Sequence, residues 1–506
     1  MSRAPVVTGI GIAAPNGLGA ERYWAATRAG VSGIGPVARF DAAQYPSRLA
    51  GEVAGFDAAE HLPSRLLPQT DHMTRLALVA AGEALDDAAV EPGGDAALDR
   101  GVVTAASAGG FEFGQRELEM LWSRGGEYVS AYQSFAWFYA VNTGQISIRH
   151  GLKGPGGVLV TDQAGGLDAI AEARRQLRRR SRLIVCGGVD GSICPWGRTA
   201  QLTSGRLGTG DDPATAYLPF DERAAGHVPA EGGAILVLED PEDARERGAP
   251  RVYGEIAGYA ATFDPRPGGG RGSTLRRAIE GALADAGTRP GEIDVVFADA
   301  AATPALDRAE TEAIAAVFGD RAVPVTAPKT MLGRMYAGTA ALDVATALLA
   351  IRDGVIPPTV NVRPAHHHPI EVVTGGPRRA PLRAAVVIAR GQGGFNSALV
   401  VRAAGPASPD GRGAHSRWEE RIMPDRPLEL DELSTIFRES AGVDHAVDFD
   451  GAAIDTEFDE LGIDSIALME TASRISREHG VRLDEEELAG ATTARLLLDL
   501  VNERKR

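Results

Sequence analysis

The chain has 506 residues, of which 44% are hydrophobic and 24% charged, with a formal net charge of −16. This length predicts two or three domains, and the composition is that of an ordinary globular protein. No apolar stretch is long enough for a membrane helix and no signal-peptide pattern begins the chain, so we expect a cytoplasmic protein without a membrane span.

The acidic charge is concentrated near the C-terminus. Residues 423–506 hold 21 acidic and 9 basic residues, a net charge of −12. This segment argues against nucleic acid as a partner and favours basic protein surfaces. Residues 405–424 are rich in Gly, Pro, Ser and charge, and predict a flexible linker between a domain at 1–404 and another at 425–506. Either a natural or an engineered fusion would produce this change.

Within the first domain, short apolar runs alternate with helical patterns. The runs that predict strands lie at 6–13, 101–107, 156–162, 182–189 and 234–240. Residues 74–89 and 165–180 carry apolar side chains at three- and four-residue intervals, which indicates helices. Strands that alternate with helices predict a doubly wound α/β architecture.

A weak internal repeat divides this domain at about residue 245. VLVTDQ (158–163) leads into a helix in the first half (1–245), and VPVTAPK (323–329) leads into a helical run in the second (246–404). Each half then closes on a glycine-rich apolar strand. A duplicated α/β unit with two facing turns is typical of the thiolase-like fold.

Three longer segments carry a family resemblance: PFDERAAGHVPAEGGAILVLE (219–239), TPALDRAETEAIAAVFGD (303–320) and GVIPPTVN (354–361). With the repeat, they make residues 1–404 resemble the ketosynthase family over essentially their full length. In that family a cysteine holds the growing acyl chain, and two histidines help to decarboxylate the extender unit and stabilise the resulting negative charge.

The resemblance implies that this catalytic set is lost here. Gln163 stands at the position of the cysteine, Asp299 and Arg334 stand at those of the two histidines, and Lys329 is a lysine that the family also uses. An amide, a carboxylate and a guanidinium cannot form a thioester or perform the family's proton transfers. We therefore expect that the chain alone does not condense acyl groups.

The turn DQAGGLDA (162–169) resembles that of the chain-length factor, the ketosynthase beta subunit of type II aromatic polyketide synthases. The resemblance implies a heterodimer with a catalytic ketosynthase, whose cysteine feeds a poly-β-ketone chain into a tunnel at the interface. The depth of this tunnel helps to set chain length, and the partner performs the acyl transfer and decarboxylative Claisen condensation.

Two other functions remain open for this domain. Gln163 at a helix N-terminus could act as an amide donor that decarboxylates a malonyl thioester and initiates chains, although we expect no histidine near it. Its alternative is a hydrogen-bonded structural replacement for the cysteine. The domain could also be a non-catalytic scaffold for the enzymes of the pathway.

AGGFEFGQRELEMLW (108–122) resembles the segment at the far end of the family's tunnel. Phe111, Gly114 and Leu118 lie at i, i+3 and i+7, on one face of a helix. If this face points into the tunnel, Gly114 and Leu118 leave room for a long product, of nonaketide or decaketide size. Ordinary core packing is the alternative.

The run AYQSFAWFYAVNTGQ (131–145) is rich in aromatic residues, in a chain with only 6% of them. Phe135, Trp137 and Phe138 are too closely spaced for one helical face. Aromatic residues concentrate at interface cores, and in the resembling family this region meets the partner. We expect a partner interface, with ordinary core packing as the alternative.

The C-terminal domain predicts three main helices, at 432–442, 456–481 and 492–505, and resembles an acyl carrier protein, a small all-α bundle. The resemblance implies 4′-phosphopantetheine covalently bound to Ser465. Its acidic neighbours Asp464 and Glu470 would dock on basic patches of other proteins. The implied partners are the ketosynthase, a malonyl-loading acyltransferase, a phosphopantetheinyl transferase, a ketoreductase and cyclases.

We expect no metal and no nucleotide cofactor. Cys186 and Cys194 fit neither a disulfide framework nor a zinc site and are expected to be buried. AHHHP (365–369) has three adjacent histidines, which cannot all face one ion in a regular loop, and predicts a solvated loop. PRPGGGRGS (265–273) lacks the lysine of a phosphate-binding loop.

Overall fold

The computed structural model describes residues 4–91, 93, 95–179, 181–266, 272–404, 428–441, 449, 451–458, 460, 461, 468, 471, 472, 475, 479, 481, 483 and 485–505. The chain divides into two compact units, Met1–Pro406 and Ala407–Arg506. None of the helices in these described ranges is long and apolar enough to cross a membrane.

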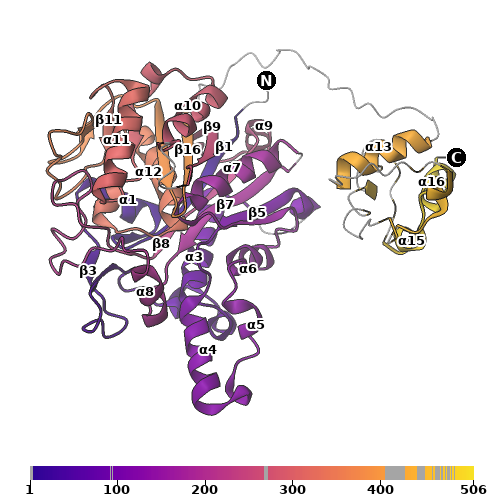
Figure 1. Cartoon of the computed structure of the whole chain (residues 1–506), viewed down its shortest axis with the longest axis horizontal. Helices are drawn as coiled ribbons and strands as arrows, with labels where there is room; N and C mark the ends of the chain where they lie inside the picture. The colour runs from indigo at the N-terminus through magenta and orange to yellow at the C-terminus, as the bar shows by residue number, and fades with distance from the viewer. Residues whose placement is uncertain are drawn as a thin grey trace. The chain divides into compact units, whose positions relative to one another are not determined.

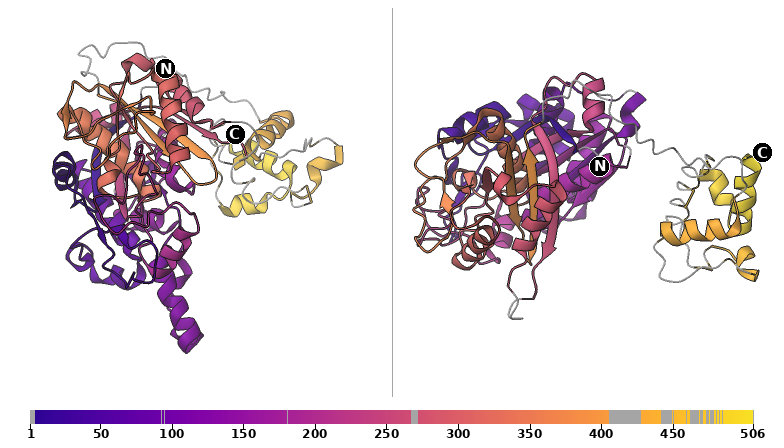
Figure 2. Two further views of the ribbon diagram at one scale, coloured as in Figure 1. Left: turned by 60° about the vertical axis from the view of Figure 1, so that its left-hand side comes forward. Right: turned by 90° about the horizontal axis from the view of Figure 1, so that it is seen from above.

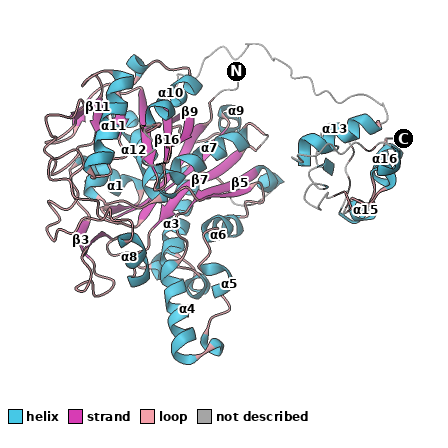
Figure 3. Ribbon diagram, viewed as in Figure 1, coloured by secondary structure: helices cyan, strands magenta, loops and turns pink. Residues whose placement is uncertain are grey.

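The first unit is built on one mixed sheet with helices on its faces (Figure 3). In sheet order, its first half comprises β1 (Val6–Ala14), β8 (Gly232–Glu239), β7 (Leu183–Asp190), β5 (Arg100–Ala105) and β6 (Gly156–Leu159). Its second half comprises β9 (Gly254–Phe263), β16 (Phe395–Arg402), β15 (Ala384–Arg390), β10 (Val295–Phe297), β11 (Pro324–Thr326) and β13 (Glu371–Val372).

The two halves share one topology. The pairs β1–β8 and β8–β7 are antiparallel, whereas β7–β5 and β5–β6 are parallel. In the second half, β9–β16 and β16–β15 are antiparallel, and β15–β10 and β10–β11 are parallel. A short antiparallel pairing of β1 with β9 joins the halves. The duplicated thiolase-like fold predicted from the repeat is confirmed.

Small strands and helices complete this unit. Short strands are β2 (Gly17–Leu18), paired with β1, and the two-stranded sheets β3 (Ile34–Pro36) with β4 (Leu49–Gly51) and β12 (Val355–Ile356) with β14 (Arg378–Arg379). The helices not described below are α1 (Ala20–Arg28), α2 (Ala58–His61), α6 (Val141–His150), α8 (Pro195–Leu202) and α9 (Pro241–Glu246).

Two central helices, α7 (Gly165–Leu177) and α12 (Ala337–Asp353), pack against each other and share a core with strands of both halves (Figure 1). The outer faces are covered by α3 (His72–Asp87) on the first half, and by α10 (Leu275–Ala286) and α11 (Pro304–Phe318) on the second. A Cβ atom on Gly166 would lie 2.5 Å from the Ala341 backbone nitrogen, so the close approach of α7 to α12 requires glycine there.

Because each central helix follows a strand and a short turn, the two turns meet near the middle of the unit. The turn before α7 is the 3₁₀ segment η4 (Asp162–Ala164), and α12 is preceded by η6 (Pro328–Met331) and the loop that carries Arg334. Both turns contain a non-glycine residue in the left-handed region, Asp162 with φ 51° and Tyr336 with φ 49°. Such conformations persist only where the surrounding structure imposes them.

An arm protrudes from the first unit in the views of Figures 1 and 2. It consists of α4 (Phe111–Arg124), the turn η3 (Gly126–Tyr128) and α5 (Gln133–Ala136). Two contacts attach the base of α4: Asp71 Oδ2 accepts from the Phe113 backbone nitrogen at 2.8 Å, and the Arg39 guanidinium bridges Glu112 to Glu231.

The second unit is helical in its described part, with α13 (Leu430–Ala441), α15 (Glu485–Gly490) and α16 (Ala494–Arg504). Its core includes Leu433, Phe437, Phe458 and Leu497, all nearly inaccessible to solvent. The helices expected at 432–442 and 492–505 correspond to α13 and α16. Most of the segment 456–481 lies outside the described residues, and so do Asp464, Ser465 and Glu470.

Candidate functional site

Gln163 lies in the turn η4, directly before α7, with 6% of its surface exposed. The turn is tied to the opposite half of the unit, because Asp162 Oδ2 accepts from the Gln392 backbone nitrogen at 2.6 Å. This is the strand–turn–helix position in which the ketosynthase resemblance expects a nucleophile. The side chain present there is an amide, which cannot attack a thioester.

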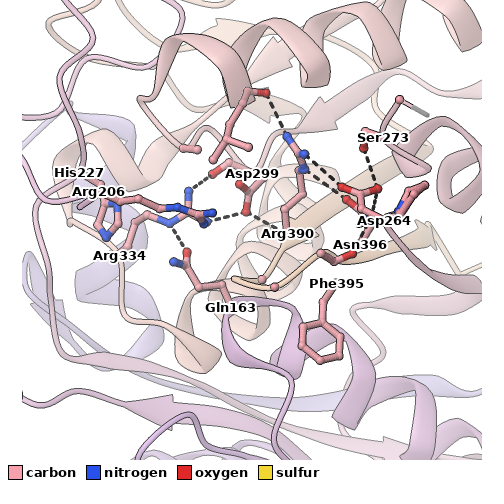
Figure 4. Close-up of a pocket in the computed structure, with 17 residues that line it drawn as sticks. Gln163, Arg206, His227, Asp264, Ser273, Asp299, Arg334, Arg390, Phe395 and Asn396 are labelled. Atoms are coloured by element: carbon pink, nitrogen blue, oxygen red, sulfur yellow. Dashed lines mark hydrogen bonds and ion pairs between the residues drawn. The ribbon is translucent and has the colours of Figure 1, made fainter. Parts of the chain in front are cut away.

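The three residues predicted at the lost catalytic positions form one buried network (Figure 4). Arg334 Nε donates to Gln163 Oε1. The same guanidinium donates from Nη2 to Asp299 Oδ1 at 2.6 Å and from Nη1 to the Asp299 backbone oxygen at 2.8 Å. Three donors of one planar guanidinium are therefore used within the site.

Charge within this network is balanced. Burial opposes ionisation of Asp299, but the charges of Arg334 and Lys329 outweigh it and hold the Asp299 pKa below its usual value. Lys329 is itself paired with Asp343 at 2.6 Å, and both are buried. The site thus holds two compensated ion pairs.

A buried glutamate positions the backbone of this site. The carboxylate of Glu310, on α11, accepts from the backbone nitrogens of Asp299 at 2.6 Å and Ala300 at 2.9 Å. Burial, followed by the charge of Asp299, raises the Glu310 pKa to about 7. This contact explains how Ala300 is held at a φ of 54°, a conformation that is unfavourable for a residue with a Cβ atom.

The prediction that no histidine lies beside Gln163 is wrong. His227 lines the same cavity, has only 3% of its surface exposed, and its Nε2 atom has no hydrogen-bond partner in the part of the chain that the structure describes. Burial and the charge of Arg334 lower the His227 pKa to about 3, so the imidazole is neutral at pH 7. The only signal in the sequence was that His227 is the single histidine of the segment 219–239, a few residues before β8 begins.

Two cavities meet at Gln163. The larger has a volume of about 370 Å³ and is lined by Gln163, Arg206, His227, Asp264, Asp299, Arg334, Arg390 and Phe395, among others. The smaller has about 240 Å³ and is lined by Gln163, Arg206, His227, Phe111, Tyr336 and Gln392, among others. Both are large enough for small acyl groups.

Phe111, Gly114 and Leu118 lie on α4, the helix that the sequence predicts there. The Phe111 ring stacks on Trp196 of α8 with centroids 4.5 Å apart. A Cβ atom on Gly114 would lie 3.1 Å from Trp196 Cζ3, so the expectation of open room at Gly114 is wrong for this chain. Trp196 fills that space, and its sequence position, 82 residues away, gave no indication of this.

Of the predicted interface residues, Phe135 is half-buried, and Trp137 and Phe138 are exposed. Trp137 has 42% and Phe138 has 40% of their surface exposed. Their neighbour Tyr139 is exposed as well, and its ring lies 4.2 Å from that of Phe138. Ordinary core packing is therefore wrong for Trp137 and Phe138.

The remaining candidates give less. Cys186 and Cys194 are free and buried, as predicted. No group of three or more His, Cys, Asp or Glu side chains that could hold a metal ion occurs among the described residues. The solvated loop predicted at 365–369 is wrong for His368, which has 5% of its surface exposed and hydrogen-bonds through Nδ1 to Thr311 at 3.0 Å.

Comparisons with known proteins cover both units. Residues 3–244 match the family described as Beta-ketoacyl synthase, N-terminal domain, and residues 253–363 its C-terminal domain. Residues 431–501 match the Phosphopantetheine attachment site. The chain is 63% identical over 399 residues to the tetracenomycin polyketide synthase ketoacyl synthase beta subunit of Streptomyces glaucescens, an alignment that covers 78% of this chain and 98% of that one.

Two solved structures are similar to the chain, each over 80% of its length and 100% of theirs, with a TM-score of 0.71. One, at 28% identity, is the ishigamide ketosynthase/chain length factor. The other, at 25% identity, is a type II polyketide synthase acyl-carrier protein in complex with its ketosynthase bound to the hexaketide. The chain therefore belongs to the beta-ketoacyl synthase family, as a ketosynthase beta subunit (chain length factor) of type II polyketide synthases with a phosphopantetheine-attachment domain at its C-terminus.

Proposed function

We propose that this chain is the chain-length-determining subunit of a type II polyketide synthase. It pairs with a catalytic ketosynthase to build a poly-β-ketone chain of set length. Its C-terminal domain holds malonyl and polyketide thioesters on phosphopantetheine attached to Ser465, inside the matched range 431–501. The chain has no condensing activity of its own, and the partner carries the acyl transfer and decarboxylative Claisen condensation.

The observation that carries this proposal is the network of Gln163, Arg334 and Asp299. It lies where the sequence resemblance expects the family's catalytic residues, it contains no nucleophile, and its buried ion pair uses the polar atoms that a substrate would need. A buried guanidinium paired with a carboxylate stays protonated and cannot act as a base. We infer that the fold is kept because a catalytic partner subunit binds it, and not because this site reacts with a substrate.

Two surfaces support a heterodimer. Strand β6 ends the sheet, and its outer edge has no neighbour among the described strands, which leaves backbone groups free to pair with another chain. Trp137 and Phe138 form an exposed aromatic patch beside the arm, the residue type that is enriched at interface cores. We assign both to the contact with the catalytic ketosynthase.

The face of α4 that carries Phe111 and Leu118, with the Phe111–Trp196 stack, is assigned to the end of the polyketide tunnel. The bulk of these rings then limits how far the chain extends. Asp464 and Glu470 are assigned to docking of the carrier domain. Its partners are the ketosynthase, a malonyl-loading acyltransferase, a phosphopantetheinyl transferase, a ketoreductase and cyclases, and no metal or nucleotide is required.

A second candidate is malonyl decarboxylation through Gln163, and the presence of His227 in the same cavity favours it. It predicts that a malonyl thioester on Ser465 loses CO2 and becomes an acetyl thioester on the same carrier without a partner, and that Gln163→Ala abolishes this. The Gln163 oxygen accepts from Arg334, which leaves the amide nitrogen as the donor that this role requires. A pure scaffold role, the third alternative, predicts that Phe111 and Leu118 substitutions leave product length unchanged.

The test is product analysis after co-expression with a matched ketosynthase, a phosphopantetheinyl transferase and a malonyl source. We expect a polyketide of one length only when both subunits are present, and its loss with Ser465→Ala when no other carrier is supplied. The chain without the partner is the control. Elongated product from the chain alone would overturn the assignment of Gln163, Asp299 and Arg334 as an inactive site.

A further inference from the structure

The arm helix α4 buries little of its surface. Three of its fourteen residues, Phe113, Gly114 and Glu117, are buried. A helix that removes so little apolar surface from water gains little from hydrophobic packing, which in any case has no directional preference. The polar contacts at the base of α4 therefore decide where this helix lies.

One of these contacts is made by Asp71, whose carboxylate caps two helices at once. Asp71 Oδ1 accepts from the Met73 backbone nitrogen at 2.8 Å, in the first turn of α3. Asp71 Oδ2 accepts from the Phe113 backbone nitrogen at 2.8 Å, in the first turn of α4. The first N–H groups of a helix have no acceptor within that helix, so the two oxygens satisfy one such donor in each. Because Asp71 has only 4% of its surface exposed, this double cap is a buried link between α3 and α4.

The α3 side of this link belongs to the core. The buried face of α3 packs in one cluster with residues of β5, β7 and β8. On the α4 side the fit is close, since a Cβ atom on Gly110 would lie 2.9 Å from Asp71 Cβ and 2.3 Å from the Ala136 backbone oxygen. The first turn of α4 is therefore held against a well-packed helix, at a point where no side chain fits between them.

A second polar contact holds the same turn. The Arg39 guanidinium donates to Glu112 on α4 and to Glu231, directly before β8. The Glu231 side chain is 3% exposed and also accepts from the Val53 backbone nitrogen at 3.0 Å, so the Arg39 guanidinium is anchored in the core on this side. The Glu112 side chain, in contrast, is 45% exposed. Its carboxylate contributes to the position of α4 and little to the core.

Phe111 is the residue that these contacts place. It begins α4, directly before Glu112 and two residues before Phe113. Its ring stacks on Trp196 with centroids 4.5 Å apart and lines the smaller cavity. A displacement of the first turn of α4 therefore displaces the Phe111 ring, although neither contact involves that ring itself.

We propose that Asp71 and the Arg39–Glu112 pair are positioning groups, which hold Phe111 at the end of the polyketide tunnel and thereby narrow the product to one length. They touch no substrate and act through the backbone of α4. This inference rests on the proposed function, in which the Phe111 face of α4 ends the tunnel.

Two substitutions loosen the two contacts separately. Asp71→Ser keeps an oxygen that can cap α3 and leaves the Phe113 N–H without its acceptor. Glu112→Met removes the carboxylate on α4 and leaves the Arg39–Glu231 pair intact. Asp240→Ser, at the cap of α9, is the matched control for the first, and Glu119→Met, at an exposed position of α4, is the control for the second.

The first measurement is hydrogen exchange of the full-length chain, read by mass spectrometry. In Asp71→Ser we expect amides in the segment 111–114 to exchange about fivefold or more faster than in the wild type, because a buried hydrogen bond of this turn is lost. Amides in the interior of α3, at 76–85, should keep their protection. Unchanged exchange at 111–114 would overturn the double cap.

The second measurement is product length after co-expression with the ketosynthase partner. In Asp71→Ser and in Glu112→Met the dominant length should fall to about half of its wild-type share, with neighbouring lengths appearing, since a site about 1 Å too loose loses its selectivity. Both control variants should keep the wild-type distribution. A merely structural role would lower the total yield and leave the proportions of the lengths unchanged.

The outcomes separate this inference from the proposed function. If the wild type and its partner give no polyketide of one length, the proposed function fails, and hydrogen exchange still tests the double cap. If the wild type gives one length and both variants give the same proportions, the positioning role is overturned. If Asp71→Ser does not fold, Glu112→Met decides alone, because its half-exposed side chain can be replaced without disturbing the core.

Discussion

The network around Gln163 and the arm beside it follow opposite rules. Around Gln163, Arg334 and Asp299 the chain buries charge and compensates it with short hydrogen bonds. On the arm and just after it, Trp122, Trp137 and Phe138 are apolar and exposed. A buried charge is unfavourable unless an opposite charge pairs with it, and an exposed apolar patch is unfavourable unless another surface covers it. The buried charges of Arg334 and Asp299 pair within the chain. The difference teaches that the buried charges of Arg334 and Asp299 are compensated within the chain, whereas the exposed rings have no cover within the chain and await another protein under the proposed function.

The largest effect should come from breaking the internal network. Arg334→Met leaves the Asp299 carboxylate buried without its cation, and removal of one partner of a buried ion pair costs about 3–5 kcal/mol of unfolding free energy. Chemical denaturation of the full chain measures this. Arg276→Met, which breaks an exposed pair with Glu280 on α10, is the control and should cost less than about 0.5 kcal/mol.

The double variant Arg334→Met with Asp299→Asn removes both charges of the pair. It should recover part of the loss, because no uncompensated charge remains in the interior. If Arg334→Met alone is as stable as the wild type, the guanidinium does not compensate Asp299, and the contrast with the arm fails.

The next effect tests the incomplete region. Trp137→Ser with Phe138→Ser should weaken association with the catalytic ketosynthase by about 30-fold or more, because buried aromatic residues dominate interface energies. Because both side chains are exposed in the single chain, its own unfolding free energy should change little. Analytical ultracentrifugation of the mixed subunits measures the affinity.

Val31→Ser, at another exposed apolar residue, is the control for this surface and should leave association unchanged. A large loss of monomer stability in the Trp137 and Phe138 variant, with normal association, would place these rings in the fold and not in the interface.

A third prediction concerns product length. Gly114→Phe introduces a ring where a Cβ atom alone would already lie 3.1 Å from Trp196 Cζ3 and 3.5 Å from Trp137 Cβ. The added ring must displace Trp196, which stacks on Phe111, and Phe111 lines the smaller cavity. If Phe111 is pushed into this cavity, the dominant polyketide should lose one or more two-carbon units. Mass spectrometry of the co-expression products reads this directly. Glu119→Phe, on the exposed face of α4, should leave product length unchanged.

The sequence could predict what lies within single segments. The sequence predicts the strand–turn–helix at 158–177 and its repeat at 323–353 because hydrophobic periodicity is local, and Gln163, Asp299 and Arg334 each stand beside a motif of their own. The contacts between these positions were not visible. Gln163 and Arg334 are 171 residues apart, and nothing in either segment states that an amide there accepts from a guanidinium.

Two further features needed the fold. The sequence predicts open space at Gly114 because the side chain that fills it, Trp196, comes from another helix. It does not identify His227, because a single histidine inside a matched block gives no sign of burial or of the cavity that it faces. Both errors concern what surrounds a residue in space. The fold class needed only the repeat, since a duplication leaves its trace in the chain order of the elements.

The smallest effect is a pH dependence of the free energy of unfolding that comes from His227, which is buried without a partner for Nε2, unlike the paired charges around it. The His227 pKa is about 3 in the folded chain, against an ordinary value of 6.5. Between these values the unfolded chain binds the proton and the folded chain does not, so the free energy of unfolding should fall as the pH drops below about 6.5, by at most about 1.4 kcal/mol per pH unit. His227→Phe should remove this contribution.

Other groups also gain or lose protons in this pH range, so their contribution must be separated from that of His227. The Glu310 pKa of about 7 acts in the opposite direction, because its raised value stabilises the fold at lower pH and this contribution is lost as the pH rises through 7. Glu310 is present in both variants, so its contribution cancels in the difference between wild type and His227→Phe at each pH. Denaturation at pH 7.5, 6.0 and 5.0 should show that the wild type loses stability relative to the variant at each step. A difference independent of pH would mean that the His227 imidazole is accessible to solvent and that its Nε2 atom is not a buried nitrogen without a partner.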